Sequence, residues 1–307
     1  MMRVTPGLIT MQLARDLNTA LAALTKQQDM IATGRRVNAP ADDPAGTARA
    51  LTVRSRQAAN AQFQKNIDTA RSNLTTADAS VRSVIDALQQ AKDLAIQGAN
   101  DSNDAAAKQA IGAQVDQVLE QIVATANSRG PRGAMLFGGQ EVTVAPYTVT
   151  RDVNGKIAAV TVNARGIDGS MPAEVAEGLT VAQGVSGNTV FGAMSSVSNA
   201  FDTLIGLRNA LNTNNAAGIQ DGITNTTLAH DRAVDASIQL GTRAGWLDAL
   251  ENRLKDEAVT LTSSLGAIED ADMAKAISDL TQIQTFYEAG LASGARLLRQ
   301  SLADFLR

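Results

Sequence analysis

The chain contains no cysteine and only one histidine among its 307 residues. Without cysteine it can form neither disulfides nor thiolate metal sites, and it has no cysteine nucleophile. Aromatic residues make up 3% of the chain, too few for base-stacking platforms or a rich ligand pocket. The 27 basic and 31 acidic residues are interspersed, with a formal net charge of -4, so nucleic-acid binding is not indicated.

Long apolar runs are also missing, because no window approaches 18 uninterrupted apolar residues. The start, Met1 to Gln12, lacks the charged, apolar and small-residue order of a secretory signal. We therefore expect a soluble chain that neither spans nor binds a membrane and carries no cleaved signal.

Proline is confined to six positions, which leaves residues 45–130 and 173–307 free of the strongest helix breaker. In the first of these stretches, apolar and small residues alternate at steps of three and four for about five heptads. Such a repeat is typical of a coiled-coil helix, and it predicts a helix from about Pro44 to Gly98. The repeat consists of Asn60, Phe63, Ile67, Ala70, Leu74, Ala77, Val81, Val84, Leu88, Ala91 and Ala95.

A connector reading GRRVNAPADDPAG separates this helix from an earlier amphipathic helix that should end at Gly34. Asp43 is placed to cap the long helix and Pro44 to occupy its first turn. Asp42 and Asp43 are predicted to pair with arginines of the connector rather than to act as acid and base. The predicted connector residues are Arg35, Arg36, Asn38, Asp42, Asp43 and Pro44.

The middle of the chain differs in composition, because 11 of the 24 glycines fall between residues 130 and 192. Period-2 runs flank Asn154-Gly155, which predicts a β-hairpin with a type I′ turn. Helical patterns return after this stretch, with a possible kink between Gly241 and Gly245. The predicted parts are a terminal-helix domain (1–36 and 269–307), a connector (37–46), a helical rod (47–130 and 194–268) and a β-rich insert (131–193).

These patterns predict a mainly α fold, an elongated coiled-coil-like bundle of N- and C-terminal helices with a small β-rich insert. Both terminal helices carry apolar residues nearly to the chain ends, which are usually frayed and polar. We expect this stripe to contact further copies of the chain or related chains, although docking on the chain's own body remains an alternative. The predicted interface residues are Leu13, Leu17, Leu21, Leu24, Ile31, Leu280, Leu291, Leu298, Leu302 and Phe305.

Candidate catalytic and metal sites have simpler interpretations. His230 and Asp231 are adjacent on a predicted helix, so their side chains should not face each other. The cluster Asp101, Asn103 and Asp104 lacks the glycine and the glutamate of a calcium loop, and helix capping explains it better. We therefore predict no enzyme activity, no cofactor and no bound metal.

Three segments resemble the flagellin superfamily. They are the start MRVTPGLITMQLARDLNTAL, the connector TGRRVNAPADDPAGTARAL and the end IEDADMAKAISDLTQIQTFYEAGLASGARLLRQSLADFLR, and the resemblance covers residues 2–135 and 195–307. Within the superfamily, DDPAGTARAL and the ending SLADFLR resemble the hook-filament junction members more than the filament subunits. Met1-Met2 is one residue longer than the usual opening.

The resemblance implies an extracellular structural component of the bacterial flagellum, exported unprocessed by the flagellar type III apparatus. It implies a ring of copies between a FlgK-like junction protein and flagellin, and an export chaperone, FlgN, at the C-terminal region. The connector residues would set the angle between inner and outer domains. A filament flagellin is the alternative within the superfamily; a hydrolase hidden in 131–193 or a secreted coiled-coil adhesin or toxin are alternatives outside it.

Overall fold

A computed structural model describes residues 6–163, 165, 167–196 and 198–305, and the chain divides into two compact units. The first unit, here the terminal unit, comprises residues 1–59 and 256–307, and the second, here the rod unit, comprises residues 60–255. Both boundaries fall inside long helices, α2 (Pro44–Gly98) and α6 (Ala216–Glu269). The predicted mainly α fold is confirmed.

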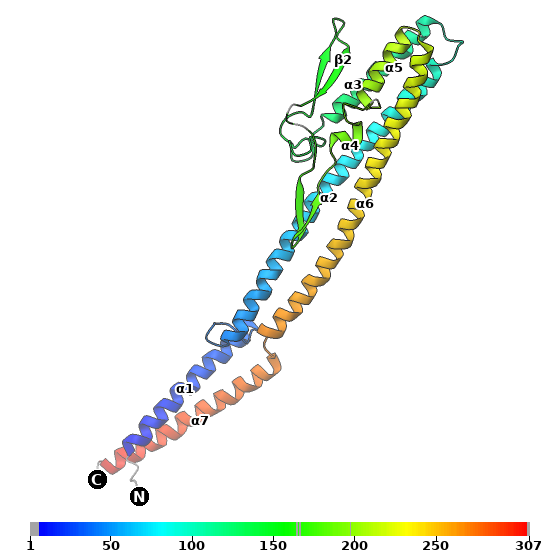
Figure 1. Ribbon diagram of the computed structural model, residues 1–307. Coiled ribbons are helices and arrows are strands. Elements are labelled where there is room, and N and C mark those ends of the chain that lie inside the picture. The colour runs from blue at the N-terminus through cyan, green and yellow to red at the C-terminus, as the bar shows by residue number, and fades with distance from the viewer. Residues whose placement is uncertain (1–5, 164, 166, 197, 306–307) are drawn as a thin grey trace. The chain divides into compact units, whose positions relative to one another are not determined.

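In the terminal unit, α1 (Pro6–Thr33) lies beside α7 (Met273–Phe305), so the first and last helices of the chain are paired (Figure 1). The predicted end of α1 is confirmed at Gly34, which adopts a left-handed φ of +69° suited to a helix terminus. The beginning of α2 is also confirmed, because Asp43 caps it and Pro44 is its first residue.

In the rod unit, the predicted heptad repeat of α2 is confirmed by burial. Ten of its eleven residues are buried and Phe63 packs against them. The part of α6 in this unit carries a matching repeat, and the side chain of Asn60 donates a 3.0 Å hydrogen bond to the carbonyl of Leu254. The matching buried residues of α6 are Ile219, Thr226, Ala229, Ala233, Ala236, Leu240, Leu247, Leu250 and Leu254.

Two shorter helices, α3 (Ala105–Ala126) and α5 (Ala200–Asn212), pack against each other in the same unit. Asp104 caps α3 by accepting a 2.7 Å hydrogen bond from the N–H of Ala107, which confirms the capping interpretation of that acidic cluster. Buried Arg208 of α5 donates to Asp116 of α3 over 2.6 Å. α6 continues through Gly241 and Gly245 without a break in its hydrogen-bonded helix.

The glycine-rich middle forms two separate antiparallel hairpins. The first pairs β1 (Tyr147–Arg151) with β2 (Ile157–Val162), and the second pairs β3 (Pro172–Ala176) with β4 (Leu179–Ala182). The predicted type I′ turn is wrong, because such a turn needs positive φ at both Asn154 and Gly155 and only Gly155, at +79°, has it. Asp152 instead accepts hydrogen bonds from the N–H groups of Asn154 and Lys156, which stabilises a longer loop.

Four of the nine aromatic residues gather where this middle segment meets the helices. Phe191 of α4 (Gly187–Phe191) lies with its ring centroid 5.2 Å from Phe137, 5.5 Å from Tyr147 and 5.2 Å from Phe201 of α5. All four side chains are buried, and they belong to one continuous core with α2, α3 and α6. The β-rich segment therefore shares the core of the rod unit.

The heptad core of α2 predicts a large cost for truncation. Leu88→Ala should lower the free energy of unfolding by about 2–5 kcal/mol, because Leu88 is fully buried and its loss leaves a cavity. Ile96→Ala, on the same helix but 53% exposed, should change it by less than about 0.5 kcal/mol. Urea unfolding followed by circular dichroism measures both, and equal losses would contradict the assigned core face.

Candidate assembly interface

The pairing of α1 with α7 rests on a second pair of heptad repeats. Less exposed positions recur at alternating steps of four and three along both helices, which is the spacing of a coiled-coil seam. We call these positions the terminal seam. They are Leu13, Leu17, Ala20, Leu24, Gln27 and Ile31 on α1, and Ala276, Leu280, Ile283, Tyr287, Gly290 and Gly294 on α7.

Small residues of α7 leave room for leucines of α1 in this seam. A Cβ at Gly290 would lie 3.0 Å from Cδ2 of Leu17, and one at Gly294 would lie 2.8 Å from Cδ2 of Leu13. The buried Gln27 donates a 3.0 Å hydrogen bond to the carbonyl of Ala276, which fixes the register of the two helices. The seam is therefore an intramolecular contact with a defined alignment.

Large apolar side chains remain exposed next to the seam. Successive helical residues are about 100° apart, and on antiparallel helices this places four of them roughly 60–100° to the same side of the seam. We call this surface the apolar flank. It consists of Leu21 (45% exposed), Met273 (39%), Ile277 (53%) and Leu291 (47%).

The predicted interface residues fall into three groups. Five of them (Leu13, Leu17, Leu24, Ile31 and Leu280) are half-buried in the terminal seam, so α1 and α7 use them to pair with each other. Leu21 and Leu291 lie on the apolar flank. Leu298, Leu302 and Phe305 have side chains outside the described residues.

Sequence reasoning missed two flank residues, Met273 and Ile277. Ile277 precedes Leu291 by two heptads and so shares its position in the repeat, a spacing that could have identified it. It also missed Phe286, which is 63% exposed on the other side of the seam. Its neighbour Tyr287 takes the seam position, because adjacent residues cannot both face the partner helix.

The connector between α1 and α2 is held by its own carboxylates. Asp42 accepts hydrogen bonds from the N–H groups of Asn38 (3.2 Å) and Ala39 (2.9 Å) and pairs with Lys26 of α1 at 2.8 Å. Asp43 accepts the N–H of Gly46 at the start of α2, at 2.7 Å. The connector is thus a structured turn.

The predicted ion pairs of the connector are half correct. Arg36 pairs with Asp43 at 3.3 Å as expected, but Arg35 lies 3.8 Å from Glu269 rather than beside Asp42 or Asp43. The reason is a backbone bridge between Arg35 and Asp270, which brings Arg35 to the end of α6. Glu269 is only 4% exposed and also accepts a 2.8 Å hydrogen bond from Arg54.

The backbone completes this junction. The N–H of Arg36 donates to the carbonyl of Glu269 at 2.6 Å, and the N–H of Ala271 donates to the carbonyl of Gly34 at 2.9 Å. The chain entering α2 is therefore tied to the chain leaving α6 at the point where each passes between two helices. These bonds hold together the four helical segments of the terminal unit.

The surroundings of Asp42 and Asp43 in the connector favour the ionised form of both carboxyl groups. The hydrogen bond from Lys26, followed by those from Ala39 and Asn38, lowers the pKa of Asp42 to about 2 from its ordinary value of 3.8. The N–H of Gly46, followed by Arg36, lowers the pKa of Asp43 below its ordinary value. Both groups are thus charged partners for the cations around them near neutral pH.

The acidic residues and the histidine were candidates for metal binding and catalysis in the sequence. Over the described residues, histidine, aspartate and glutamate form no group of three that could hold a metal ion. His230 and Asp231 do contact each other, with 3.2 Å between Nδ1 and Oδ1, so the expectation that they face apart is wrong. The side chain of Asp231 is 67% exposed and that of His230 is 22% exposed, and among the described residues no third group hydrogen-bonds to the histidine. In the same described part, no helix has the length and apolar character to cross a membrane.

The family models for the bacterial flagellin N-terminal helical region and the flagellin C-terminal helical region match residues 7–141 and 224–306. Together these segments contain both terminal helices, the connector and most of α2, α3 and α6. The chain therefore belongs to the bacterial flagellin family, whose members are structural proteins of the flagellum.

Within the family, the chain is similar to flagellar hook-associated protein 3 of Escherichia coli, with 22% identity over 94% of both chains. It is also 23% identical to a flagellin of Listeria monocytogenes, over 95% of this chain and 94% of that one. The crystal structure of hook-associated protein 3 from Legionella pneumophila shares the fold, with a TM-score of 0.61 and 14% identity over 71% of this chain and 98% of that chain.

The lowered pKa of Asp42 predicts an acid-dependent connector. A depressed folded-state pKa contributes stability above the unfolded pKa, so the contribution is complete above about pH 5 and is lost as the pH falls through about 2. Asp42→Asn should therefore be less stable than the unmodified chain at pH 6, and the difference should shrink steadily below about pH 4. Thermal unfolding at a series of pH values measures it; a difference that is constant with pH would refute the assignment.

Proposed function

We propose that this chain is an adaptor at the hook-filament junction of the bacterial flagellum, where copies of it form a ring on which flagellin polymerises. The observation that carries the proposal is the apolar flank, which stays exposed beside the terminal seam where α1 and α7 pair. The similarity to hook-associated protein 3 along 94% of both chains supports the junction role. The proposal assigns the chain a mechanical role without enzymatic activity.

The flank needs a partner outside the chain. Its four side chains are 39–53% exposed although α1 and α7 already cover each other's seam. Burying a large aliphatic side chain fully is worth about 1.5–3 kcal/mol, so covering four half-exposed ones gives a substantial driving force. A further helix from a neighbouring chain can lie along the two helices and cover them. Terminal units of related subunits supply such helices.

The partners follow from the family. A FlgK-like junction protein on one side and flagellin on the other would each present paired terminal helices of the same kind. Export through the flagellar type III apparatus without a cleaved signal, with a FlgN-like chaperone at the C-terminal region, belongs to the same proposal. The terminal helices would then complete their contacts on meeting partner helices, which couples folding to assembly. The connector residues would set the angle between inner and outer domains.

A filament subunit is the second candidate, because the similarity to the Listeria flagellin is as extensive as that to hook-associated protein 3. The two roles differ in copy number, since a filament needs many subunits and a junction ring few. They also differ in what happens to exported flagellin when the protein is missing.

Deletion of the gene separates the two candidates. For a junction adaptor we expect intact hooks without filaments and unpolymerised flagellin in the medium, because export continues while the platform for polymerisation is missing. Electron microscopy of the cells and immunoblotting of the medium measure this. Absent or shortened filaments without flagellin in the medium would contradict the adaptor role and identify the chain as the filament subunit.

A further inference from the structure

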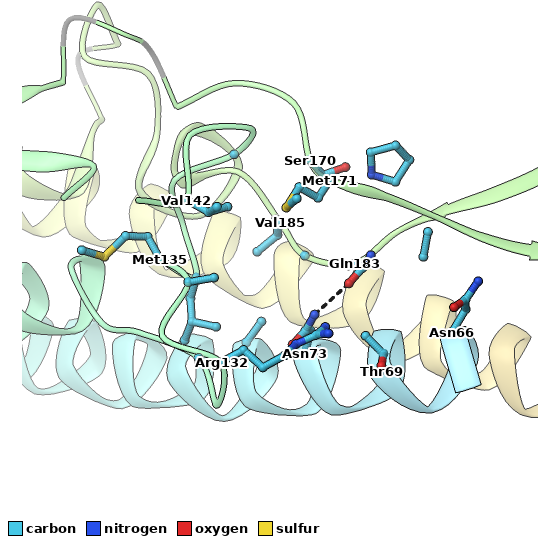
Figure 2. A pocket seen from close by; sticks show the side chains of 18 of the residues that line it. Asn66, Thr69, Asn73, Arg132, Met135, Val142, Ser170, Met171, Gln183 and Val185 are labelled. Carbon is cyan, nitrogen blue, oxygen red and sulfur yellow. Dashed lines mark hydrogen bonds between the residues drawn. The ribbon is translucent and has the colours of Figure 1, made fainter. Parts of the chain in front are cut away.

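A groove in the rod unit lies between α2, the loop of residues 130–142 and the hairpin of β3 and β4 (Figure 2). Its volume is about 660 Å³, within the range of protein sites that hold a small ligand. Its apolar residues include Met135, Leu136, Met171 and Val185. Met171 is 49% exposed, so part of this apolar surface faces solvent.

Side-chain amides form the polar wall of the groove. Asn66 of α2 donates a 2.7 Å hydrogen bond to the carbonyl of Glu174 in β3. Asn73, one heptad further along α2, donates a 2.9 Å hydrogen bond to Gln183, and Figure 2 shows this bond. These amides hold the hairpin beside α2. The remaining amide donors and acceptors suit the N–H and C=O groups of a polypeptide.

The charged side chains of the groove are mostly basic. Lys65 and Arg132 line it, and neither forms an ion pair within the described part of the chain. The one acid in the lining, Glu174, has its carboxylate oriented to the N–H of Gly178 at 3.3 Å. In a chain with a net charge of -4, such a site favours an acidic occupant.

An acidic segment of matching character occurs at the end of the same hairpin. The turn joining β3 to β4 consists of Glu177 and Gly178, and Gly178 has a left-handed φ of +68°. Glu177 is exposed, and the next residue after the turn, Leu179, is 38% exposed. We call Glu177–Leu179 the hairpin tip. It presents a carboxylate and an apolar side chain two residues apart.

We propose that the hairpin tip of one copy docks in the groove of a second copy. Glu177 faces Lys65 and Arg132 of the neighbour, and Leu179 packs on the apolar surface around Met171. Because tip and groove are different surfaces, the contact is heterologous and propagates from copy to copy, closing into a ring where the rotation allows it. This inference rests on the proposed function, because it names one of the contacts between copies in the proposed ring.

The cysteine-free chain allows a direct test by disulfide cross-linking of the full-length protein. One pool carries Thr69→Cys, in the groove, and a second pool with a different tag carries Thr180→Cys, beside the hairpin tip. Mixed and oxidised, they should give several-fold more heterodimer than a control in which Gln90→Cys, exposed on the same helix, replaces Thr69→Cys. Heterodimer at the control level would overturn the proposal.

Reversing the charges of the groove tests the proposed ion pairs, and reversing the charge of the hairpin tip as well should restore the contact. Lys65→Glu with Arg132→Glu in the groove pool should reduce the heterodimer about tenfold, because like charges then face each other. Glu177→Lys in the tip pool should restore it. If the yield of heterodimer stays the same after both changes, the proposed charge pairing is wrong. The cross-link is scored on purified protein and the junction role on filaments in cells, so each can fail without the other.

Discussion

Side chains that repeat at alternating steps of three and four residues pair α1 with α7, and the same repeat buries one face of α2 and of α6 in the rod unit. The rest of the protein depends on this repeat. It brings residues near the start of the chain beside residues near its end, and it needs no cysteine and few aromatics to do so. Alanine and glycine at many positions let the backbones approach closely, as Gly290 and Gly294 do beneath Leu17 and Leu13.

Pairing of the termini has a functional consequence. A two-helix seam covers only one stripe of each helix, so Leu21, Ile277 and Leu291 are left exposed on one side of it. In an isolated chain this exposed apolar surface is unfavourable, and it is the surface that we propose as the contact in an assembly of similar helices. The connector fixes the same unit from the other end, where Asp43 starts α2 and buried Glu269 joins Arg54 at the end of α6.

The long helices could be predicted from the sequence because their repeats are local. The helix ends could be predicted as well, because one residue type is enough to favour each of them. Glycine favours the C-terminal end at Gly34, aspartate the N-cap at Asp43 and proline the first turn at Pro44. The roles of the terminal leucines could not be separated in the same way. Leu17 and Leu21 look alike in sequence, and only the structure shows that Leu17 is half-buried in the seam while Leu21 is exposed on the flank. Likewise, the ion pair between Arg35 and Glu269 could not be predicted. It depends on a backbone bridge between Arg35 and Asp270, which are far apart in the sequence.

The most direct test of the account concerns the apolar flank. A deletion strain is complemented with Ile277→Asp and Leu291→Asp together, or with the control pair Ser278→Asp and Ser293→Asp, two exposed serines of α7 that lie off the apolar flank. Circular dichroism of the purified proteins checks that both fold. Electron microscopy should show filaments with the serine variant and bare hooks with the flank variant. Normal filaments on the flank variant would contradict the claim that this surface mediates assembly.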